Sequence, residues 1–258
     1  MDLGIRGKIA LICASSQGLG LACAHSLAGE GVNIILNGRD EAKLAKVADE
    51  LADYGVEVRT ICADLMTQEG RDAIIAQAGD IDILVNNNAG PPPGHLKDWD
   101  HAALLSAIEA NMIPAVLLMR AFIPGMRERK FGRIVNITSA MVKSPHPLMG
   151  LSTSARAGLT AISKAISRDV AIDNVTINNL LPERIDTPRQ EFMAQRIMAQ
   201  QGIDRDAARQ QIADTVAAKR FGTTKEFGDA CAYLCSAQAG FISGQNLQVD
   251  GGSYEGLI

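Results

Sequence analysis

Two serines and an arginine stand at positions from which they could act on one substrate. Ser139 ends the apolar run GRIVNITS, and Ser152 and Arg156 lie in GLSTSARAG, the stretch that opens the next predicted helix. Residues four apart share a helix face, so Ser152 and Arg156 point the same way. Two hydroxyl donors and a lasting cation suit the stabilisation of negative charge on an oxygen atom. None of these groups is a good proton donor, because an aliphatic hydroxyl is a weak acid and guanidinium keeps its protons.

Other groups close to the two serines could supply a proton. The loop AMVKSPHPLMGL (140–151) carries Lys143 and His146. Imidazole changes its protonation near neutral pH, so His146 is a candidate, although an exposed loop histidine without a role fits the pattern as well. Lys143 fits a solvated loop charge, and Tyr254 would have to reach the site from the C-terminal tail or from a neighbouring subunit. A bound water is a further alternative.

Short apolar runs alternate with segments of helical periodicity along the whole chain. The runs cover 9–14, 32–37, 56–64, 81–86, 132–139, 174–181 and 241–252. This alternation is typical of a doubly wound parallel sheet with helices on both faces. We therefore predict an α/β Rossmann fold of about seven strands in a single domain, 1–258. The polar segment 188–220 is expected to be helical and to form a lid or substrate-facing insertion within that domain.

Composition excludes several other classes of protein. The net charge of −4 disfavours a surface for nucleic acid or anionic membranes. The N-terminal MDLGIRG has no basic region of a signal sequence, and no apolar run approaches the length of a membrane span. The five cysteines are odd in number and scattered, which is typical of reduced, buried thiols in a cytoplasmic protein. We expect no metal site, because no cluster has the spacing of metal ligands.

The first predicted strand runs into CASSQGLG, residues 13–20. Glycines at a strand-to-helix turn let backbone N–H groups approach a pyrophosphate, and the helix N-terminus adds a favourable dipole. Gly18 and Gly20 would give this approach, and Ser15 and Ser16 add hydroxyl donors. The spacing is not G-x-G-x-x-G, so a tight turn with close helix packing is the alternative. Because doubly wound sheets bind nucleotides at their first strand-to-helix turn, we favour a dinucleotide.

The end of the second predicted strand, LNGRD (36–40), indicates which dinucleotide. An acidic residue at this strand end would bind a ribose 2′-hydroxyl, but Gly38 takes that place and Arg39 follows. An arginine suits a 2′-phosphate, so we predict NADP(H) rather than NAD(H). The alternative is a solvated arginine at a helix start, with Asp40 capping the helix.

Taken in order, these stretches resemble the short-chain dehydrogenase/reductase family, in the branch made of one Rossmann domain. CASSQGLG resembles that family's Thr-Gly-x-x-x-Gly-x-Gly loop, and VNNNAG (85–90) its Asn-Asn-Ala-Gly strand end. LLPERIDTP (180–188) resembles its Pro-Gly…Thr segment beside the nicotinamide, with Glu183 in place of glycine. The resemblance implies these cofactor-binding residues: Ala14, Ser15, Ser16, Gln17, Gly18, Leu19, Gly20, Arg39, Asp64, Leu65, Asn87, Ala89, Pro182, Ile185 and Thr187.

The resemblance also implies catalytic positions. Ser139 matches the family's catalytic serine, and Asn111, in EANMIP, matches its catalytic asparagine. The family's tyrosine and lysine fall on Ser152 and Arg156, so the spacing is kept while the chemistry is changed. With His146 as a possible proton donor, these residues form the predicted catalytic set. The implied function is an NAD(P)H-dependent oxidoreductase acting on a small-molecule carbonyl or alcohol, similar to a 3-oxoacyl reductase, in a homotetramer or homodimer.

A second function fits the same sequence. Loss of the tyrosine and the lysine is what a catalytically silent partner subunit or binding module would show. The replacements are polar, stand in register and are flanked by matching motifs, which favours the enzyme.

Overall fold

Seven parallel strands form one sheet in the order β3-β2-β1-β4-β5-β6-β7. The computed structural model describes residues 1–257. The strands are β1 (Ile9–Ile12), β2 (Asn33–Gly38), β3 (Val58–Cys62), β4 (Ile83–Asn86), β5 (Gly132–Ile137), β6 (Val175–Pro182) and β7 (Asn246–Val249). The chain builds outward from β1 to β3, then returns to the centre to place β4 on the other side of β1. This reversal defines the Rossmann topology, and it confirms the predicted fold.

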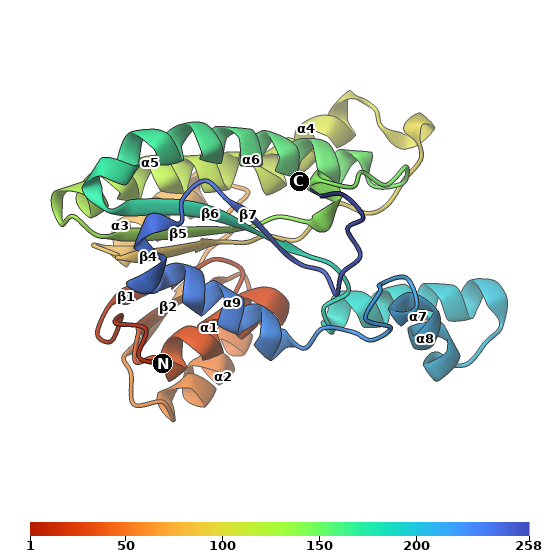
Figure 1. The fold of residues 1–258 in the computed structure, drawn as a ribbon, viewed down its shortest axis with the longest axis horizontal. Helices are drawn as coiled ribbons and strands as arrows, with labels where there is room; N and C mark the ends of the chain where they lie inside the picture. Colours follow the sequence, from red (N-terminus) through yellow and green to blue (C-terminus); the bar gives the residue numbers. More distant parts are fainter. Residues whose placement is uncertain (258) are drawn as a thin grey trace.

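Helices cover both faces of the sheet (Figure 1). One face carries α1 (Gly18–Gly29), α2 (Glu41–Ala52) and α9 (Thr224–Cys235). The other face carries α3 (Gln68–Ala78), α4 (His101–Asn111), α5 (Ile113–Glu128) and α6 (Gly150–Val170). Short 3-10 helices cover Leu96–Asp98, Ala140–Val142, Ala171–Asp173 and Gln238–Phe241. Each layer of helices closes its own apolar core against the sheet.

The segment predicted as a lid forms two helices, α7 (Pro188–Gln201) and α8 (Arg205–Ala213). They extend past the carboxyl edge of the sheet as a hairpin (Figure 1). The hairpin has a small apolar centre of its own, built around Ala194, Ala208 and Ile212. It is therefore held to the body of the protein mainly through the two chain segments that enter and leave it.

Several predicted boundaries were wrong by a few residues. β1 ends at Ile12 rather than at 14, because Ala14 has a positive φ of 46° and turns the chain out of the strand. The last strand covers only Asn246–Val249, and a 3-10 helix precedes it. The expectation that all cysteines are buried was wrong for Cys62, which is exposed at the end of edge strand β3, whereas the other four are buried.

One stretch, His101–Glu128, is long and apolar enough to cross a membrane by length and composition alone. In this fold it is two helices, because the backbone of Met112 departs from helical geometry between α4 and α5. The inner side of α5 packs against the sheet through Leu118, Met119 and Phe122. Core helices pass the same length test, so the stretch gives only weak evidence of a membrane span.

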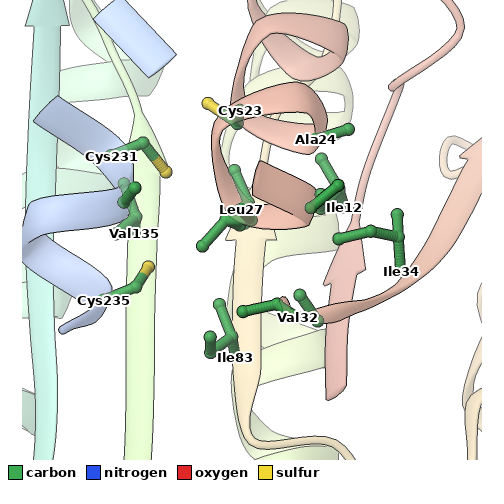
Figure 2. Packing of buried hydrophobic residues seen from close by; sticks show 14 of the residues in the cluster. Ile12, Cys23, Ala24, Leu27, Val32, Ile34, Ile83, Val135, Cys231 and Cys235 are labelled. Atoms are coloured by element: carbon green, nitrogen blue, oxygen red, sulfur yellow. The ribbon is translucent and has the colours of Figure 1, made fainter. Parts of the chain in front are cut away.

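Close packing joins α1 to α9 (Figure 2). Cys231 and Cys235 of α9 lie across from Cys23 and Leu27 of α1, above the buried side chains of the central strands. The helices approach closely because α9 has Gly228 at the contact, where a Cβ would collide with the carbonyl oxygen of Ala22. A backbone atom inside a helix cannot move aside cheaply, so the contact requires glycine.

We expect Gly228→Ala to lower the free energy of unfolding by about 1–3 kcal/mol, the usual cost of overpacking a core. Gly29→Ala on α1 is the matched control, since its Cβ would lie 3.7 Å from the nearest ring carbon of Tyr54. The control should be neutral or stabilising by up to ~1 kcal/mol. Urea unfolding of the two variants compares them, and equal stabilities would contradict the packing described here.

Candidate active site

A row of buried asparagines crosses the sheet just below its carboxyl edge. Asn86 donates a side-chain hydrogen bond to Asn136 (2.8 Å), Asn136 to Asn179 (3.1 Å) and Asn179 to Asn246 (2.8 Å). The four residues are paired in register on β4 to β7. Sequence reasoning missed this ladder, because its members lie in four separate apolar runs. The ladder fixes the register of β4 to β7 relative to one another, and predicted site residues follow β4, β5 and β6.

The turn after β1 has the close contacts that a nucleotide-binding turn needs. A Cβ on Gly20 would lie 2.5 Å from the carbonyl oxygen of Ala14 and 3.0 Å from Nδ2 of Asn87. Asn87 donates to that same carbonyl oxygen (3.2 Å), so the predicted residues of β4 and the turn are in contact. Gly18 has a positive φ of 62°, which glycine adopts at little cost. These contacts bring the turn and the first residues of α1 close to the sheet.

The first turn of α1 is open to an anionic group. Gln17 occupies the N-cap position without a side-chain hydrogen bond to the helix, and the first turn has no acidic residue. The leading N–H groups of the helix can therefore point at a phosphate. Ser15 differs from its prediction, because its hydroxyl donates to Asn37 O (3.3 Å) and accepts from Asn37 N (3.1 Å). Ser15 thus anchors the turn to β2, whereas Gln17, Gly18 and Leu19 lie at the mouth of the turn.

The end of β2 presents a position suited to an extra phosphate. A Cβ on Gly38 would lie 3.4 Å from the hydroxyl oxygen of Ser16, so this strand end stands next to the turn after β1. Arg39 is 70% exposed and lies 3.7 Å from the carboxylate of Asp64, at the end of β3. Asp40 caps α2 by accepting from Lys43 N (3.1 Å), as the alternative interpretation of this stretch expected. The cap does not involve Arg39, whose guanidinium remains at the surface.

Arg156 turns inward at the carboxyl edge of β4 and β5. It is 8% exposed, and its Nη1 donates to the carbonyl oxygens of Ile137 and Thr138, both at 2.8 Å. Its Nη2 lies 3.5 Å from the carbonyl oxygen of Asn88. No carboxylate of the described residues pairs with it, and burial, with the charge of Arg189, lowers its pKa to about 10. A buried cation thus stands directly behind the candidate site.

Both candidate serines have an accepting role already filled. Ser152 is 5% exposed, and its Oγ accepts from Nε of Arg156 (3.3 Å). Ser139 Oγ accepts from Met141 N (3.2 Å) at the start of the 3-10 helix. Because a hydroxyl donates one hydrogen bond as well as accepting, each serine retains its proton for a further partner. Gly90 lies next to Ser152 and Arg156, since a Cβ on Gly90 would be 3.9 Å from Ser152 Oγ and 3.4 Å from Nη2 of Arg156.

Asn111 is the last residue of α4 and lines the same cavity as Arg156. Its Nδ2 donates weakly to Ala107 O (3.4 Å), and its buried Oδ1 has no partner among the described residues. A cavity of about 20 Å³ lies here, with Asn86, Asn111 and Arg156 in its wall. That volume suits one water molecule, and the two asparagine Oδ1 atoms could both accept hydrogen bonds from it. Leu65 also lines this cavity, and Ala89 follows the last residue of β4 by three positions.

The segment after β6 links the site to the α7–α8 hairpin. Glu183 N donates to Val249 O (3.0 Å), and Ile185 is 4% exposed and bridges to Gly222. Thr187 is the N-cap of α7, but its hydroxyl does not cap the helix. Pro182, Ile185 and Thr187 therefore lie at the carboxyl edge with the other predicted cofactor residues. Thr187 also borders a groove of about 490 Å³ between α7 and α8.

The three alternative proton donors lie at the same edge of the sheet. His146 is exposed, and its Nδ1 accepts from Leu148 N (3.2 Å). Lys143 Nζ lies 5.1 Å from the ring centre of Tyr254, so the C-terminal tail folds back onto the loop after Ser139 within one chain. The phenol oxygen of Tyr254 lies next to Gly256 in the tail. Tyr254 therefore reaches this loop without a neighbouring subunit.

Trp99 is a further neighbour of the site that sequence reasoning did not select. Its ring packs on Gly150, two residues before Ser152, where a Cβ would collide with it. Its buried indole nitrogen has no hydrogen-bond partner among the described residues. Trp99 is the single tryptophan of the chain, so its fluorescence reports on this region.

The fold and the residues gathered at its carboxyl edge define a class of protein, the Rossmann-type dinucleotide-dependent oxidoreductases. Residues 13–254 match the profile of the family described as enoyl-(acyl carrier protein) reductase. The chain belongs to the short-chain dehydrogenase/reductase family, whose members are NAD(P)H-dependent oxidoreductases of carbonyl and alcohol groups, as the sequence predicted.

Known proteins resemble the chain over nearly its whole length. The 3-oxoacyl-[acyl-carrier-protein] reductase FabG of Escherichia coli is 30% identical, over 98% of this chain and 99% of its own length. The (2S)-[(R)-hydroxy(phenyl)methyl]succinyl-CoA dehydrogenase subunit BbsC of Thauera aromatica is 31% identical, over 98% and 96%. Among solved structures, L-sorbose reductase of Gluconobacter frateurii, complexed with NADPH and L-sorbose, has a TM-score of 0.95 and 33% identity over the full length of both chains.

We expect Arg156→Ala to lower the free energy of unfolding by about 2–4 kcal/mol, because it removes two short hydrogen bonds to buried carbonyl oxygens. The free energy of unfolding of Arg156→Lys should lie between those of Arg156→Ala and the wild type, since an ammonium keeps the charge without the forked geometry. Arg39→Ala is the control at an exposed arginine and should cost no more than ~1 kcal/mol. Urea unfolding measures all three, and an Arg156→Ala variant as stable as the wild type would show that the guanidinium does not hold these strand ends.

Proposed function

We propose that this protein is an active NADP(H)-dependent oxidoreductase that reduces a small-molecule carbonyl, with Ser139 and Ser152 binding the carbonyl oxygen. The observation that supports this most directly is the pair of serines whose acceptor positions are filled while their protons remain available. Two such donors at one edge of the sheet suit an oxygen on which negative charge develops. Decay of an active site would not be expected to preserve this arrangement.

The residues of the first turn fit a dinucleotide. Gly18 and Gly20 allow close approach of the cofactor, and the open first turn of α1 suits its diphosphate. Thr187, whose hydroxyl does not cap α7, would donate to the diphosphate as the family resemblance implies. Ser16 and Arg39 would hold a 2′-phosphate beside Gly38, with Asp64 and Leu65 at the adenine. When bound, NADPH supplies a hydride from its nicotinamide to the carbonyl carbon.

In this proposal the protein polarises the carbonyl and stabilises its reduced form. The Ser139 and Ser152 hydroxyls donate to the carbonyl oxygen, which gains negative charge as its carbon is reduced. Arg156 acts behind them, since its bond to Ser152 Oγ orients that hydroxyl and its buried charge favours an anion nearby. Asn111 would hold a water molecule in the cavity beside Arg156 through its unpartnered Oδ1, and His146 lies where it can exchange protons with solvent.

Removing either serine hydroxyl should slow the reaction. We expect Ser139→Ala and Ser152→Ala each to lower kcat about 100-fold, the usual effect of losing one oxyanion donor. Ser154→Ala is the control on the same helix, because its hydroxyl donates to Leu151 O (3.1 Å) on the exposed side. Steady-state kinetics with a carbonyl substrate measure the three variants. Unchanged kcat in both site variants would argue against hydroxyl catalysis.

The choice between NADPH and NADH should depend on Arg39. We expect Arg39→Ala to raise Kd for NADPH about 10- to 100-fold, as for the loss of a charge-assisted hydrogen bond, and to leave Kd for NADH nearly unchanged. Lys46→Ala on α2 is the control, since this lysine is 79% exposed. Quenching of Trp99 fluorescence follows both titrations. An equal loss of affinity for the two cofactors would rule out a role on the 2′-phosphate.

A catalytically silent subunit is the second candidate function. It is favoured by the absence of the tyrosine and lysine at 152 and 156, and by the similarity to BbsC, a protein named as a dehydrogenase subunit. Titration with NADPH followed by a screen of ketones separates the two. The proposed enzyme binds NADPH and oxidises it with a ketone, whereas a silent subunit turns over no ketone.

We further propose a lid segment, an oligomeric state and a cellular location for this protein. The segment 188–220, with α7 and α8, acts as a lid within a single domain, 1–258, because it is joined to the body through few contacts. The apolar outer side of α4, with Leu104 and Leu105 exposed, suits assembly into a homotetramer or homodimer. The unpaired thiols, Cys62 at the surface among them, suit a cytoplasmic location.

A further inference from the structure

A largely buried carboxyl group lies at the carboxyl edge of the sheet, beside the candidate site. Glu183 follows the last residue of β6, and its side chain is only 14% exposed. The family pattern has glycine at this position, so no carboxyl group is needed there for the fold. A carboxylate that is buried without need costs free energy, and acidic groups of this kind cluster at functional sites.

The backbone fixes where this carboxyl group stands. Glu183 N donates to Val249 O (3.0 Å), which ties the residue to β7. Leu180 of β6 is paired with Ile137 of β5, and Thr138 N donates to Leu180 O (2.8 Å). Glu183 thus leaves the sheet three residues after this pair, and Ser139 leaves it two residues after it. The two side chains come from neighbouring strands at the same edge.

The surroundings of Glu183 favour its protonated form. Burial raises its pKa, Asp250 raises it as well, and the charges of Arg184 and His146 act in the opposite direction. Arg184 Nε lies 3.1 Å from Oε1, but this N–H donates to Thr215 Oγ1 (2.9 Å). This ion pair with Arg184 favours the ionised carboxylate. Burial outweighs it, so the pKa of Glu183 lies above that of an ordinary glutamate.

We propose that Glu183 is the catalytic proton donor of this site and takes the part of the absent tyrosine, with His146 passing protons to it from solvent. The assignment rests on the proposed function. As a hydride adds to the carbonyl carbon, the C=O π bond breaks and the oxygen takes the proton of the Glu183 carboxyl group. The carbonyl is reduced to an alcohol, NADPH is oxidised to NADP⁺, and the carboxylate regains a proton from water through His146. The serines bind the oxygen, and Glu183 supplies what they cannot.

The test compares Glu183→Gln with the wild type and with Tyr254→Phe, which removes the phenol hydroxyl of the C-terminal tail. We expect Glu183→Gln to lower kcat for carbonyl reduction about 100-fold, as for loss of a general acid, with Kd for NADPH within about threefold of the wild-type value. Tyr254→Phe should retain its kcat. Glu183→Gly, which restores the residue of the family pattern, should be as slow as Glu183→Gln, so the loss would not reflect a change of fold.

The pH dependence gives a second readout. The protonated acid donates, so wild-type reduction is fastest below the pKa of Glu183 and falls as pH rises through it. Because that pKa is raised, the fall comes at higher pH than for an ordinary glutamate, and Glu183→Gln should lack it. In the ligand-free protein, ¹³C NMR of labelled glutamate should show one carboxyl resonance titrating above the others, absent from Glu183→Gln.

The outcomes distinguish failure of the Glu183 assignment from failure of the proposed function. An active wild type with an equally active Glu183→Gln, or a glutamate spectrum without the raised resonance, would overturn the assignment and leave the proposed function standing. A wild type that reduces no ketone with bound NADPH would overturn the proposed function and this assignment with it. A 100-fold loss in Glu183→Gln together with a lost pH-dependent fall supports it.

Discussion

The inward turn of Arg156 is the interaction on which the rest of the site depends. Its guanidinium binds the carbonyl oxygens of Ile137, the last residue of β5, and of Thr138, and it reaches toward that of Asn88 after β4. A lysine at this position could not make the same set of bonds, because an ammonium lacks the planar fork. The site is therefore more than the family's site with two groups removed: the cation has become part of the wall, and Ser152 is oriented by it.

Because serine replaces the family's tyrosine at position 152, oxygen binding and proton donation no longer fall to one side chain. A tyrosine binds the substrate oxygen and donates a proton through one hydroxyl, whereas serine can do only the first because it is a weak acid. In the proposed mechanism, proton donation therefore comes from a different side chain. A buried carboxyl group on the neighbouring strand, at a position where the family pattern has glycine, has the acidity that serine lacks. In this proposal, a serine and a glutamate that follow neighbouring strands together do the work of the family's tyrosine.

The sequence predicts the fold well because strand and helix periodicities are local and strong. The alternation of apolar runs was enough to give the parallel sheet, and the glycine turn marked the nucleotide end of it. The register of Ser152 and Arg156 was also readable, since a helix keeps residues four apart on one face. Boundaries failed where a single backbone angle decides them, as at Ala14.

What the sequence could not give are contacts between distant strands. The ladder from Asn86 to Asn246 spans residues 160 positions apart, and each asparagine alone resembles a polar residue at a strand end. The direction of the Arg156 side chain depends on carbonyl groups of another element. The position of Glu183 depends on its backbone contact with Val249 of β7. The sequence therefore shows that a glutamate replaces the family's glycine, but not that its side chain is largely buried.

The most direct test of the central claim, that this altered site still reduces a carbonyl, is single-turnover transfer of deuterium from NADPH labelled at the nicotinamide C4. The protein is mixed with saturating labelled NADPH and a panel of ketones, and the alcohols are analysed by mass spectrometry. The account predicts one deuterium at the carbinol carbon for at least one ketone, and none when both Ser139 and Ser152 are alanine. Saturating NADPH binding without deuterium transfer to any ketone would contradict it.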